Sequence, residues 1–449
     1  MPRPILRTPF LAATAIVGAL TLIPLATSAM AAVDTDTYRE FDQFLDVFNR
    51  VKADYVDKVD DQKLIKGAIQ GMLSSLDPHS SYVDALDYDN LRIQTEGNYG
   101  GLGLTVQMED GAVKVVAPQE DTPAYRAGVK SGDYITHIDG KLIYGETLDE
   151  AIGLMRGKPG TKISLTLVRP GQDKPVDVTM NREIIIQKPV KWEVRGDVGY
   201  ININTFSEST GADTRAAIMA IDKSLGHRPL GYVVDLRDNG GGLLTQAIAV
   251  SDAFLDHGEI VSQRGREKAD IERYFAKSGD DAHGLPVVVL TNPGTASASE
   301  IVAGALQDHH RALVMGERSF GKGSVQTLLQ LGPQTALRLT TARYYTPSGR
   351  SVQEGGIEPD IRVPQISDPD FKTRPVFREA DLRRHLINEV KADNKVLEED
   401  TKDDPRFAMT PDQLKKQGIE DFQLYYALKT VARLGGAAQV AAATKPKVK

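Results

Sequence analysis

The sequence lacks cysteine, an excess of basic residues and any long hydrophobic run beyond its N-terminus. With no Cys among 449 residues, disulfide frameworks, thiolate nucleophiles and Cys-ligated zinc or iron–sulfur sites are excluded. The 54 Lys and Arg against 61 Asp and Glu give a net charge of −7, which argues against the basic patch of a nucleic-acid-binding protein. We therefore expect no nucleic-acid partner, no metal and no cofactor.

What is present is an ordinary globular composition. Hydrophobic residues make up 41% and charged residues 26% of the chain, which excludes collagen-like, disordered and polytopic membrane classes for most of it. At about 150 residues per domain, the length predicts roughly three domains, each large enough to bury a core.

The first 31 residues have the pattern of a secretory signal peptide. Arg3 and Arg7 precede an apolar run over residues 10–25, and residues 28–31 supply an A-x-A cleavage site. The alternative is an uncleaved inner-membrane anchor, but Pro24 and a run of about 16 residues are short for a bilayer span of about 20. We expect cleavage and a periplasmic mature chain without access to ATP.

The N-terminal part of the chain divides into a helical region and a run of short strands. Apolar residues recur at helical spacing over residues 38–76, which predicts two helices. Asp77-Pro78 ends the second, because proline biases its predecessor away from the helix. From residue 97 a glycine-rich sequence opens a compact module of alternating strands with one helix over residues 148–156.

Beyond Pro189, buried strands alternate with helices, which predicts an α/β layer. Residues 365–404 are a predicted linker that holds one helix over residues 379–391. A last helix over residues 410–434 is expected to stop at Gly435-Gly436, with a disordered tail after it.

A candidate nucleophile follows the buried strand that ends at Leu290. Ser297 lies on a predicted strand-to-helix turn, where its side chain would project above the sheet and the amide of Ala298 would point at an oxyanion. The alternative is structural: Ser297 is a helix N-cap, with Glu300 completing a capping box.

A serine nucleophile needs a base. None of the eight His lies in a catalytic-looking turn: His79 follows a helix stop, and His309-His310 lie in a charged segment. Lys322, between two glycines, can serve if burial lowers its pKa from about 10.4 to about 7–8. The alternative is an exposed lysine in a turn.

Three glycines, residues 240–242, follow a second buried strand and let backbone amides face an anion, as in an oxyanion hole. Two other motifs compete for function. Residues 316–323 match G-x-x-x-x-G-K, but Gly323 stands where a phosphate-binding loop needs Ser or Thr, and strand-like sequence follows. Ser319 and Lys322 fit the S-x-x-K of β-lactamases, without the accompanying motifs.

Five ordered motifs together resemble the carboxy-terminal processing peptidases, or tail-specific proteases, which are Ser-Lys dyad serine peptidases. The likeness spans about residues 38–365. The resemblance implies that Ser297 is the nucleophile, Lys322 its general base and Gln326 the residue that orients the lysine amine, with oxyanion donors on the amides of Gly241 and Ala298. The motifs occupy residues 75–82, 236–244, 294–301, 321–326 and 345–353.

The strand-rich module resembles a PDZ domain, and its residues Gly101, Leu102, Gly103 and Leu104 fit the carboxylate-binding loop. Such a loop points amides at a terminal carboxylate while a strand edge accepts the peptide. The helix over residues 148–156 would wall the groove and favour small or apolar C-terminal residues. The apolar residues concerned are Leu148, Ile152 and Met155, for which ordinary core packing is the alternative.

The resulting fold prediction is a multidomain α+β and α/β protein: a helical N-terminal region, a PDZ domain, an α/β serine-peptidase core and a helical C-terminal region. The predicted parts are a signal peptide (1–31), the N-terminal helical region (32–96), the PDZ domain (97–185), the peptidase core (186–365), and the linker with the C-terminal helices and tail (366–449).

The functional prediction is an exported serine endopeptidase that recognises protein C-terminal tails through its PDZ domain. The alternative is a non-catalytic periplasmic PDZ scaffold that binds such tails. Expected partners are protein or peptide substrates bound by their C-termini, with an adaptor lipoprotein and peripheral inner-membrane association left open. A homo-oligomer is expected from an apolar face of the last helix, formed by Phe422, Leu424, Tyr425, Leu428 and Val431.

Overall fold

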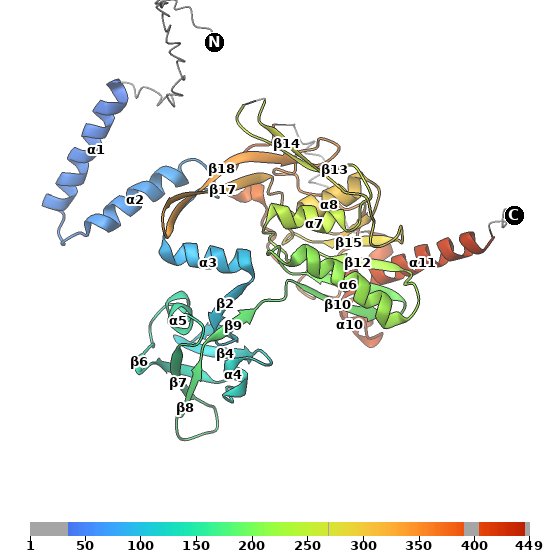
Figure 1. Ribbon diagram of the computed structural model, residues 1–449, viewed down its shortest axis with the longest axis horizontal. Helices are drawn as coiled ribbons and strands as arrows, with labels where there is room; N and C mark the ends of the chain where they lie inside the picture. The colour runs from blue at the N-terminus through green and yellow to red at the C-terminus, as the bar shows by residue number, and fades with distance from the viewer. Residues whose placement is uncertain (1–34, 268, 390–403, 445–449) are drawn as a thin grey trace, which may run out of the picture. The chain divides into compact units, whose positions relative to one another are not determined.

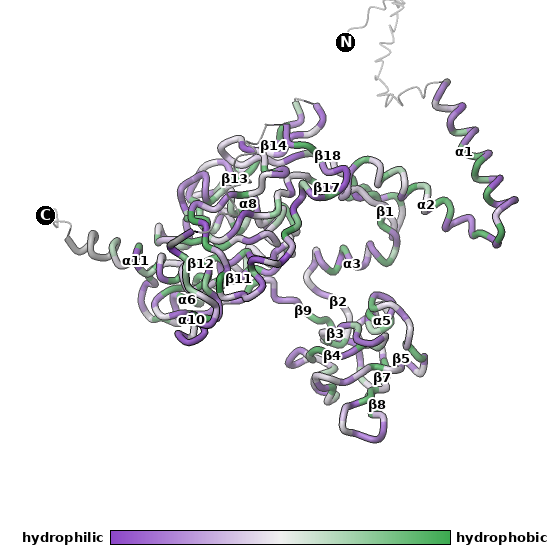
Figure 2. Tube along the Cα trace, turned by 180° about the vertical axis from the view of Figure 1, so that it is seen from behind, coloured by the Kyte–Doolittle hydropathy of each residue, from purple (hydrophilic) through white to green (hydrophobic). Residues whose placement is uncertain are grey.

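The computed structural model describes residues 35–267, 269–389 and 404–444, in a chain of two compact units, residues 1–68 and 69–449 (Figure 1). The predicted signal peptide lies outside the described residues. The first unit holds helix α1 (Thr35–Asp54) and the start of α2 (Asp61–Ser74), so the two predicted helices are confirmed. Green and purple alternate along α1 in Figure 2. Among the described helices, none is both long enough and apolar enough to cross a bilayer.

The predicted module of short strands follows α3 (Ala85–Glu96), which Asp84 caps and Gly97 ends at φ +72°. Strands β2 (Asn98–Gly101) and β9 (Glu183–Ile186) pair antiparallel where the chain enters and leaves the module. Its own apolar core includes Val115, Ile135 and Leu167. The elements between are β3 (Leu104–Glu109), β4 (Ala112–Pro118), α4 (Pro123–Arg126), β5 (Tyr134–Ile138), β6 (Lys141–Leu142), α5 (Leu148–Met155), β7 (Lys162–Val168) and β8 (Val176–Asn181).

A six-stranded sheet forms the α/β layer, in the order β10–β11–β12–β15–β16–β19. Strands β10 and β11 are antiparallel, and the others pair in parallel. Every residue of β12 and β15 is buried, as the continuous apolar runs predict for a sheet covered on both faces. The strands are β10 (Val190–Arg195), β11 (Val198–Ile203), β12 (Gly231–Asp235), β15 (Val287–Thr291), β16 (Leu313–Gly316) and β19 (Ile361–Arg362).

Successive residues of the central strands enter two different cores, because side chains alternate across a sheet. Val234 and Val289 pack with the helices of one face, α6 (Thr210–Leu225), α7 (Leu244–Asp252) and α8 (Ala298–Asp308). Val233 and Val288 pack on the other face, against residues of α10 (Pro411–Lys416) and α11 (Phe422–Thr444).

A second sheet is built around a long hairpin, β17 (Ser324–Gly332) and β18 (Thr335–Tyr345). Strand β18 also pairs with β1 (Ser81–Val83) and with β13 (Glu259–Arg264), which in turn pairs with β14 (Ile271–Phe275). The hairpin therefore joins residues 81–83 to residues 259–264, and its first residues follow Lys322.

Two helix predictions in the C-terminal region are wrong. The segment predicted as a helix from residue 379 forms only the 3₁₀ turn η1 (Glu379–Asp381), and residues 382–389 are not helical. Its polar side chains bond to other parts of the fold instead: His385 contacts Glu354, and Asn388 donates to the Gln353 carbonyl. Residues 390–391 lie outside the described residues.

The predicted last helix is two helices, α10 and α11, separated at Gly418, which has φ +71°. Helix α11 runs through Gly435-Gly436 to Thr444, so neither the predicted stop nor the predicted disorder up to that residue is correct. A Cβ on Gly435 would lie 2.1 Å from the Leu230 carbonyl oxygen, so this glycine permits close packing.

The apolar face of α11 is also used within the chain. Phe422 and Val431 are buried, and Leu424, Tyr425 and Leu428 pack partly buried against the same core. This face covers the central sheet and gives no argument for a homo-oligomer.

Candidate active site

Ser297 lies between β15 and α8, as predicted, in a backbone conformation of φ +58° and ψ −117°. A non-glycine residue at positive φ is uncommon and is held there by its surroundings. The Ser297 side chain makes no cap hydrogen bond to the helix. Its Oγ instead accepts a hydrogen bond from the Tyr344 hydroxyl at 3.0 Å. Ser297 is nevertheless the N-cap residue of α8, and Glu300 accepts from its amide as in a capping box, so the predicted structural role is present together with the contact to Tyr344.

The neighbouring Ser299 has a structural role. It is fully buried and its Oγ donates to the Asn239 carbonyl at 2.9 Å. The same carbonyl accepts from the Ala296 amide, so Asn239 ties the turn before α8 to the loop after β12.

Glu300 joins the segments that carry Ser297 and Lys322. One carboxylate oxygen accepts from the amides of Ser297 (2.7 Å) and Lys322 (3.0 Å). The other accepts from Ser319 Oγ (2.5 Å) and the Gly321 amide (2.7 Å). Glu300 is completely buried, and burial raises its pKa to about 7. The S-x-x-E spacing in the sequence pointed to Glu300, but it predicted only a capping box. It did not predict that the Glu300 carboxylate bonds the loop that carries Lys322.

Lys322 lies at the start of the hairpin and is partly buried. Burial lowers the pKa of its amine from the ordinary value, against the opposing charge of Glu379. The direction is the one a lysine base requires. Among the described residues, the Lys322 amine donates no hydrogen bond, and Tyr344 is the one partner of Ser297 Oγ.

Gln326 lies on β17, four residues after Lys322. Its Nε2 donates to Ser324 Oγ at 3.0 Å and to Thr340 Oγ1 at 3.3 Å. In this conformation Gln326 therefore bonds within the second sheet, and its role in orienting the lysine amine stays a prediction.

Gly241 lies directly against Ser297. At φ +101°, a Cβ on it would lie 2.8 Å from Ser297 Cβ and 2.9 Å from the Ala298 amide nitrogen. The Gly241 N–H donates to Asn239 Oδ1 at 2.9 Å. The two amides predicted to bind the oxyanion are thus brought together, while that of Gly241 bonds within its own loop. Their oxyanion role stays a prediction.

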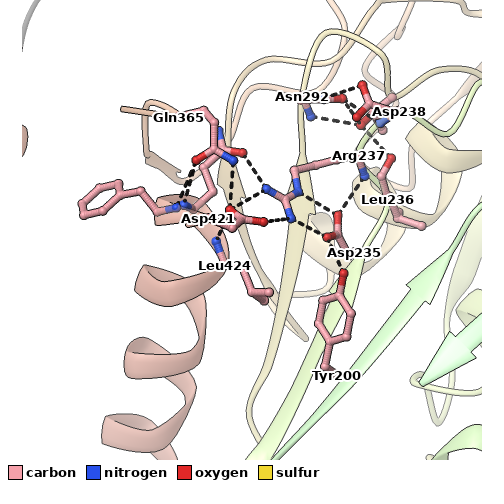
Figure 3. Close-up of polar contacts among 12 residues, drawn as sticks. Tyr200, Asp235, Leu236, Arg237, Asp238, Asn292, Gln365, Asp421 and Leu424 are labelled. Carbon is pink, nitrogen blue, oxygen red and sulfur yellow. Dashed lines mark hydrogen bonds and ion pairs between the residues drawn. The ribbon is translucent and has the colours of Figure 1, made fainter. Parts of the chain in front are cut away.

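Immediately before this loop, Arg237 joins the end of β12 to the start of α11 (Figure 3). Its guanidinium bonds both oxygens of Asp235, at 2.9 and 2.6 Å, and both oxygens of Asp421, at 3.0 and 2.7 Å. Burial lowers the pKa of Arg237, but these bonds outweigh it and raise the pKa above its ordinary value. Figure 3 also shows Tyr200 on Asp235, with the hydroxyl donating at 2.9 Å.

The same loop is bonded to the turn that precedes Ser297. The Asp238 amide donates to Asn292 Oδ1 at 2.9 Å, and Asn292 Nδ2 donates to Asp238 Oδ1 at 2.8 Å. A polar cavity of about 460 Å³ lies at these carboxyl ends of the parallel strands. The contacts form a continuous path from α11 to the nucleophile turn.

The competing motifs do not form the sites they resemble. Strand β17, not a helix, follows Gly323, so no helix N-terminus is available to bind phosphates. Ser319 is fully buried, with its Oγ donating to Glu300 and accepting from the Ile357 amide at 2.6 Å. It is not placed to attack a substrate.

Family models match three parts of the chain: the activating protease CtpB N-terminal domain over residues 24–86, a PDZ domain over residues 114–169 and peptidase family S41 over residues 197–363. The chain is 53% identical over 374 residues to a carboxy-terminal-processing protease of Bartonella bacilliformis, covering 83% of this chain and 86% of that protein. The chain belongs to the S41 carboxy-terminal-processing proteases.

This carboxy-terminal-processing protease is also 36% identical over 345 residues to CtpA of Bacillus subtilis, covering 75% of this chain and 71% of that one. A solved photosystem II D1 C-terminal processing protease is 30% identical, with 73% and 94% of the two chains covered and a TM-score of 0.43. The predicted fold class is confirmed: a multidomain α+β protein with N-terminal helices, a PDZ domain, a mixed α/β peptidase core and C-terminal helices. The protein is an S41 serine peptidase.

The predicted carboxylate loop of the PDZ domain links β2 to β3. Gly103 has φ +75°, and a Cβ on it would lie 2.3 Å from Thr122 Cβ. The carbonyls of Leu102 and Gly103 accept from the amides of Ala124 and Gln119. In the part of the chain that the structure describes, the amides of Leu102 and Gly103 have no backbone acceptor. Both residues are buried, and their predicted role in binding a terminal carboxylate stays a prediction.

Helix α5 supplies both core and surface to this domain. Met155 is buried in the domain core, so core packing is correct for this residue. Leu148 and Ile152 are half-buried and pack at the edge of that core.

Proposed function

We propose that this protease is an exported serine endopeptidase that selects proteins by their C-termini and cleaves them through a Ser297 acyl-enzyme, with Lys322 as general base. The observation that carries the proposal is the buried Glu300 carboxylate, which bonds the backbone of both residues. A strained serine and a lysine of lowered pKa, 25 positions apart in sequence, are thereby fixed in one partly buried site.

The proposed reaction begins when neutral Lys322 takes the hydroxyl proton of Ser297 as Oγ attacks the scissile carbonyl carbon. The amides of Gly241 and Ala298 then receive the oxyanion, which requires the Gly241 N–H to leave Asn239 Oδ1. Protonated Lys322 gives the proton to the departing amine as the C–N bond breaks. Water hydrolyses the acyl-enzyme by the same proton transfers in a second cycle and restores the serine.

Substrate selection is assigned to the PDZ domain. The open amides of Leu102 and Gly103 suit a terminal carboxylate, and the half-buried Leu148 and Ile152 suit a small or apolar last side chain. A substrate whose C-terminus is amidated should therefore be spared.

Export is proposed from residues 1–31 alone. Cleavage after Ala31 would release a periplasmic protein that begins at Ala32. N-terminal sequencing of the chain purified from its native compartment tests this, and an intact Met1 in that material would contradict it.

The catalytic proposal is tested with a tailed protein substrate and a serine-directed fluorophosphonate. Ser297→Ala should lose both cleavage and labelling, whereas Ser299→Ala, the matched control, should keep its labelled serine. Lys322→Ala should abolish turnover, and Lys322→Arg should not restore it, because a guanidinium stays protonated. Full activity of Ser297→Ala would refute the nucleophile, and tail binding by a wild-type protein that neither cleaves nor labels would favour the scaffold.

A further inference from the structure

A second buried cluster, unused in the reaction above, lies behind the loop that carries Lys322. Its centre is Glu379, a residue of η1 whose side chain is completely buried. His79 Nε2 lies 2.9 Å from each Glu379 carboxylate oxygen. Gln353 Nε2 donates to the same carboxylate at 3.1 Å. Three segments far apart in sequence thus converge on one carboxylate.

This cluster is bonded to the lysine loop itself. Gln353 Oε1 accepts from the Gly323 amide at 2.9 Å, and the Glu379 amide donates to the Phe320 carbonyl at 3.2 Å. Both bonds fall within two residues of Lys322. The Glu379 carboxylate is therefore held close to the backbone that presents the amine.

Charged groups on several elements around the loop influence the Lys322 amine. Burial lowers the pKa of the amine, and the negative charge of Glu379 is the largest influence that raises it. Arg338 on β18 lowers it further, while Glu300 on α8 and Asp77 raise it less than Glu379 does. The Asp77 carboxylate accepts hydrogen bonds from the Ser80 hydroxyl and from the amides of His79 and Ser80.

We propose that Glu379, held by His79 and Gln353, is a positioning residue that sets how readily the Lys322 amine releases its proton to begin catalysis. Without a nearby negative charge, a lysine in a dry site would have a very low pKa. Its amine would then lose its proton easily but would be a weak base. Glu379 restores basicity without a direct ion pair to the amine. The inference rests on the proposed role of Lys322, and it adds a group that lies outside the part of the chain matched by the S41 family model.

The test is the pH dependence of kcat/KM in the full-length protein carrying Glu379→Gln. Removing the negative charge should move the acidic limb about one unit or more toward lower pH, because an opposite charge nearby shifts a pKa by about that amount. Glu354→Gln is the matched control: this carboxylate also lies beside the lysine loop and pairs with His385 at 2.7 Å, but the main influences on the Lys322 pKa do not include it. The acidic limb of kcat/KM of this control variant should lie at the same pH as that of the wild type.

A direct readout separates this inference from the proposed function. In a Ser297→Ala background, NMR titration of the Lys322 amine should show the same downward shift with Glu379→Gln. If Glu379→Gln does not fold, Glu379→Asp, which withdraws the charge by one methylene, should give a smaller shift in the same direction. The inference is overturned if a folded Glu379 variant shows neither a shift of the acidic limb of kcat/KM nor a shift of the Lys322 titration. A fall in kcat without these shifts also overturns it. Full activity of Lys322→Ala would instead overturn the proposed function.

Discussion

The contact between Arg237 and Asp421 allows a quantitative test of how the C-terminal helix supports the catalytic loop. Replacing Asp421 by Asn removes the charge and one of the two acceptors of the bidentate pair. Asparagine is as good an N-cap as aspartate, so the bond that the side chain accepts from the Leu424 amide should survive. Oδ1 of the asparagine can also keep the bond from Gln365 Nε2, so the substitution acts mainly on the pairing with Arg237.

The expected loss of stability is about 2 kcal/mol. A hydrogen bond to a charged group contributes about 1.5–3 kcal/mol, and breaking a buried pair costs about 3–5. Two features reduce that figure: the Asp421 side chain is 33% exposed, so solvent screens it, and Asp235 still neutralises Arg237. At about 2–4 °C per kcal/mol for a chain of this kind, Tm should fall by about 4–8 °C.

Thermal unfolding of the purified protein measures this shift, and steady-state kinetics measure its effect on the loop. Because Arg237 precedes the glycines beside Ser297, kcat should fall several-fold with little change in KM. Asp404→Asn is the control: Asp404 is about as exposed as Asp421, but its partner Arg406 is 65% exposed, whereas Arg237 is 12% exposed, so the control should change Tm little. A Tm for Asp421→Asn equal to that of the wild type would refute the reasoning.

Three further outcomes follow from the site. If neutral Lys322 is the base, as proposed, kcat/KM should rise with pH and level off below the pH at which an ordinary lysine titrates, because burial lowers its pKa; a pH profile without such a rise would contradict this. Tyr344→Phe removes the donor to Ser297 Oγ and should reduce kcat about tenfold at constant KM, as steady-state kinetics will show. Gly103→Val, strained at φ +75° and crowded by Thr122, should weaken anisotropy-detected binding of a free-carboxylate peptide at least about tenfold, and unchanged affinity would argue against the loop.

The sequence predicted those parts of the fold in which local pattern and burial agree. The continuous apolar runs of β12 and β15 identified the central sheet, and the turn after β15 identified Ser297. The C-terminal region was predicted less well, because distant contacts decide its conformation. Gly435 looked like a helix stop, but it lies against the Leu230 carbonyl inside a continuing helix.

The residues that the sequence did not reveal are those whose partners are far away in the chain. Glu300 matched a capping pattern, yet its carboxylate also bonds a loop about twenty positions on. His79 looked like a residue after a helix stop, and its contact with Glu379 spans 300 positions. Tyr344 carried no motif of its own, since a tyrosine at a strand end is ordinary.

The hairpin of β17 and β18 has a consequence for anyone who alters this enzyme. Lys322 precedes β17, Tyr344 is the last but one residue of β18, and the Tyr344 amide donates to the Gly323 carbonyl at 2.9 Å. Because the strands of this hairpin are paired, Lys322 and Tyr344 are held by the same hairpin, whereas Ser297 lies at the start of α8. A substitution in this hairpin that is meant to move the Lys322 amine should therefore also move the Tyr344 hydroxyl that donates to Ser297 Oγ.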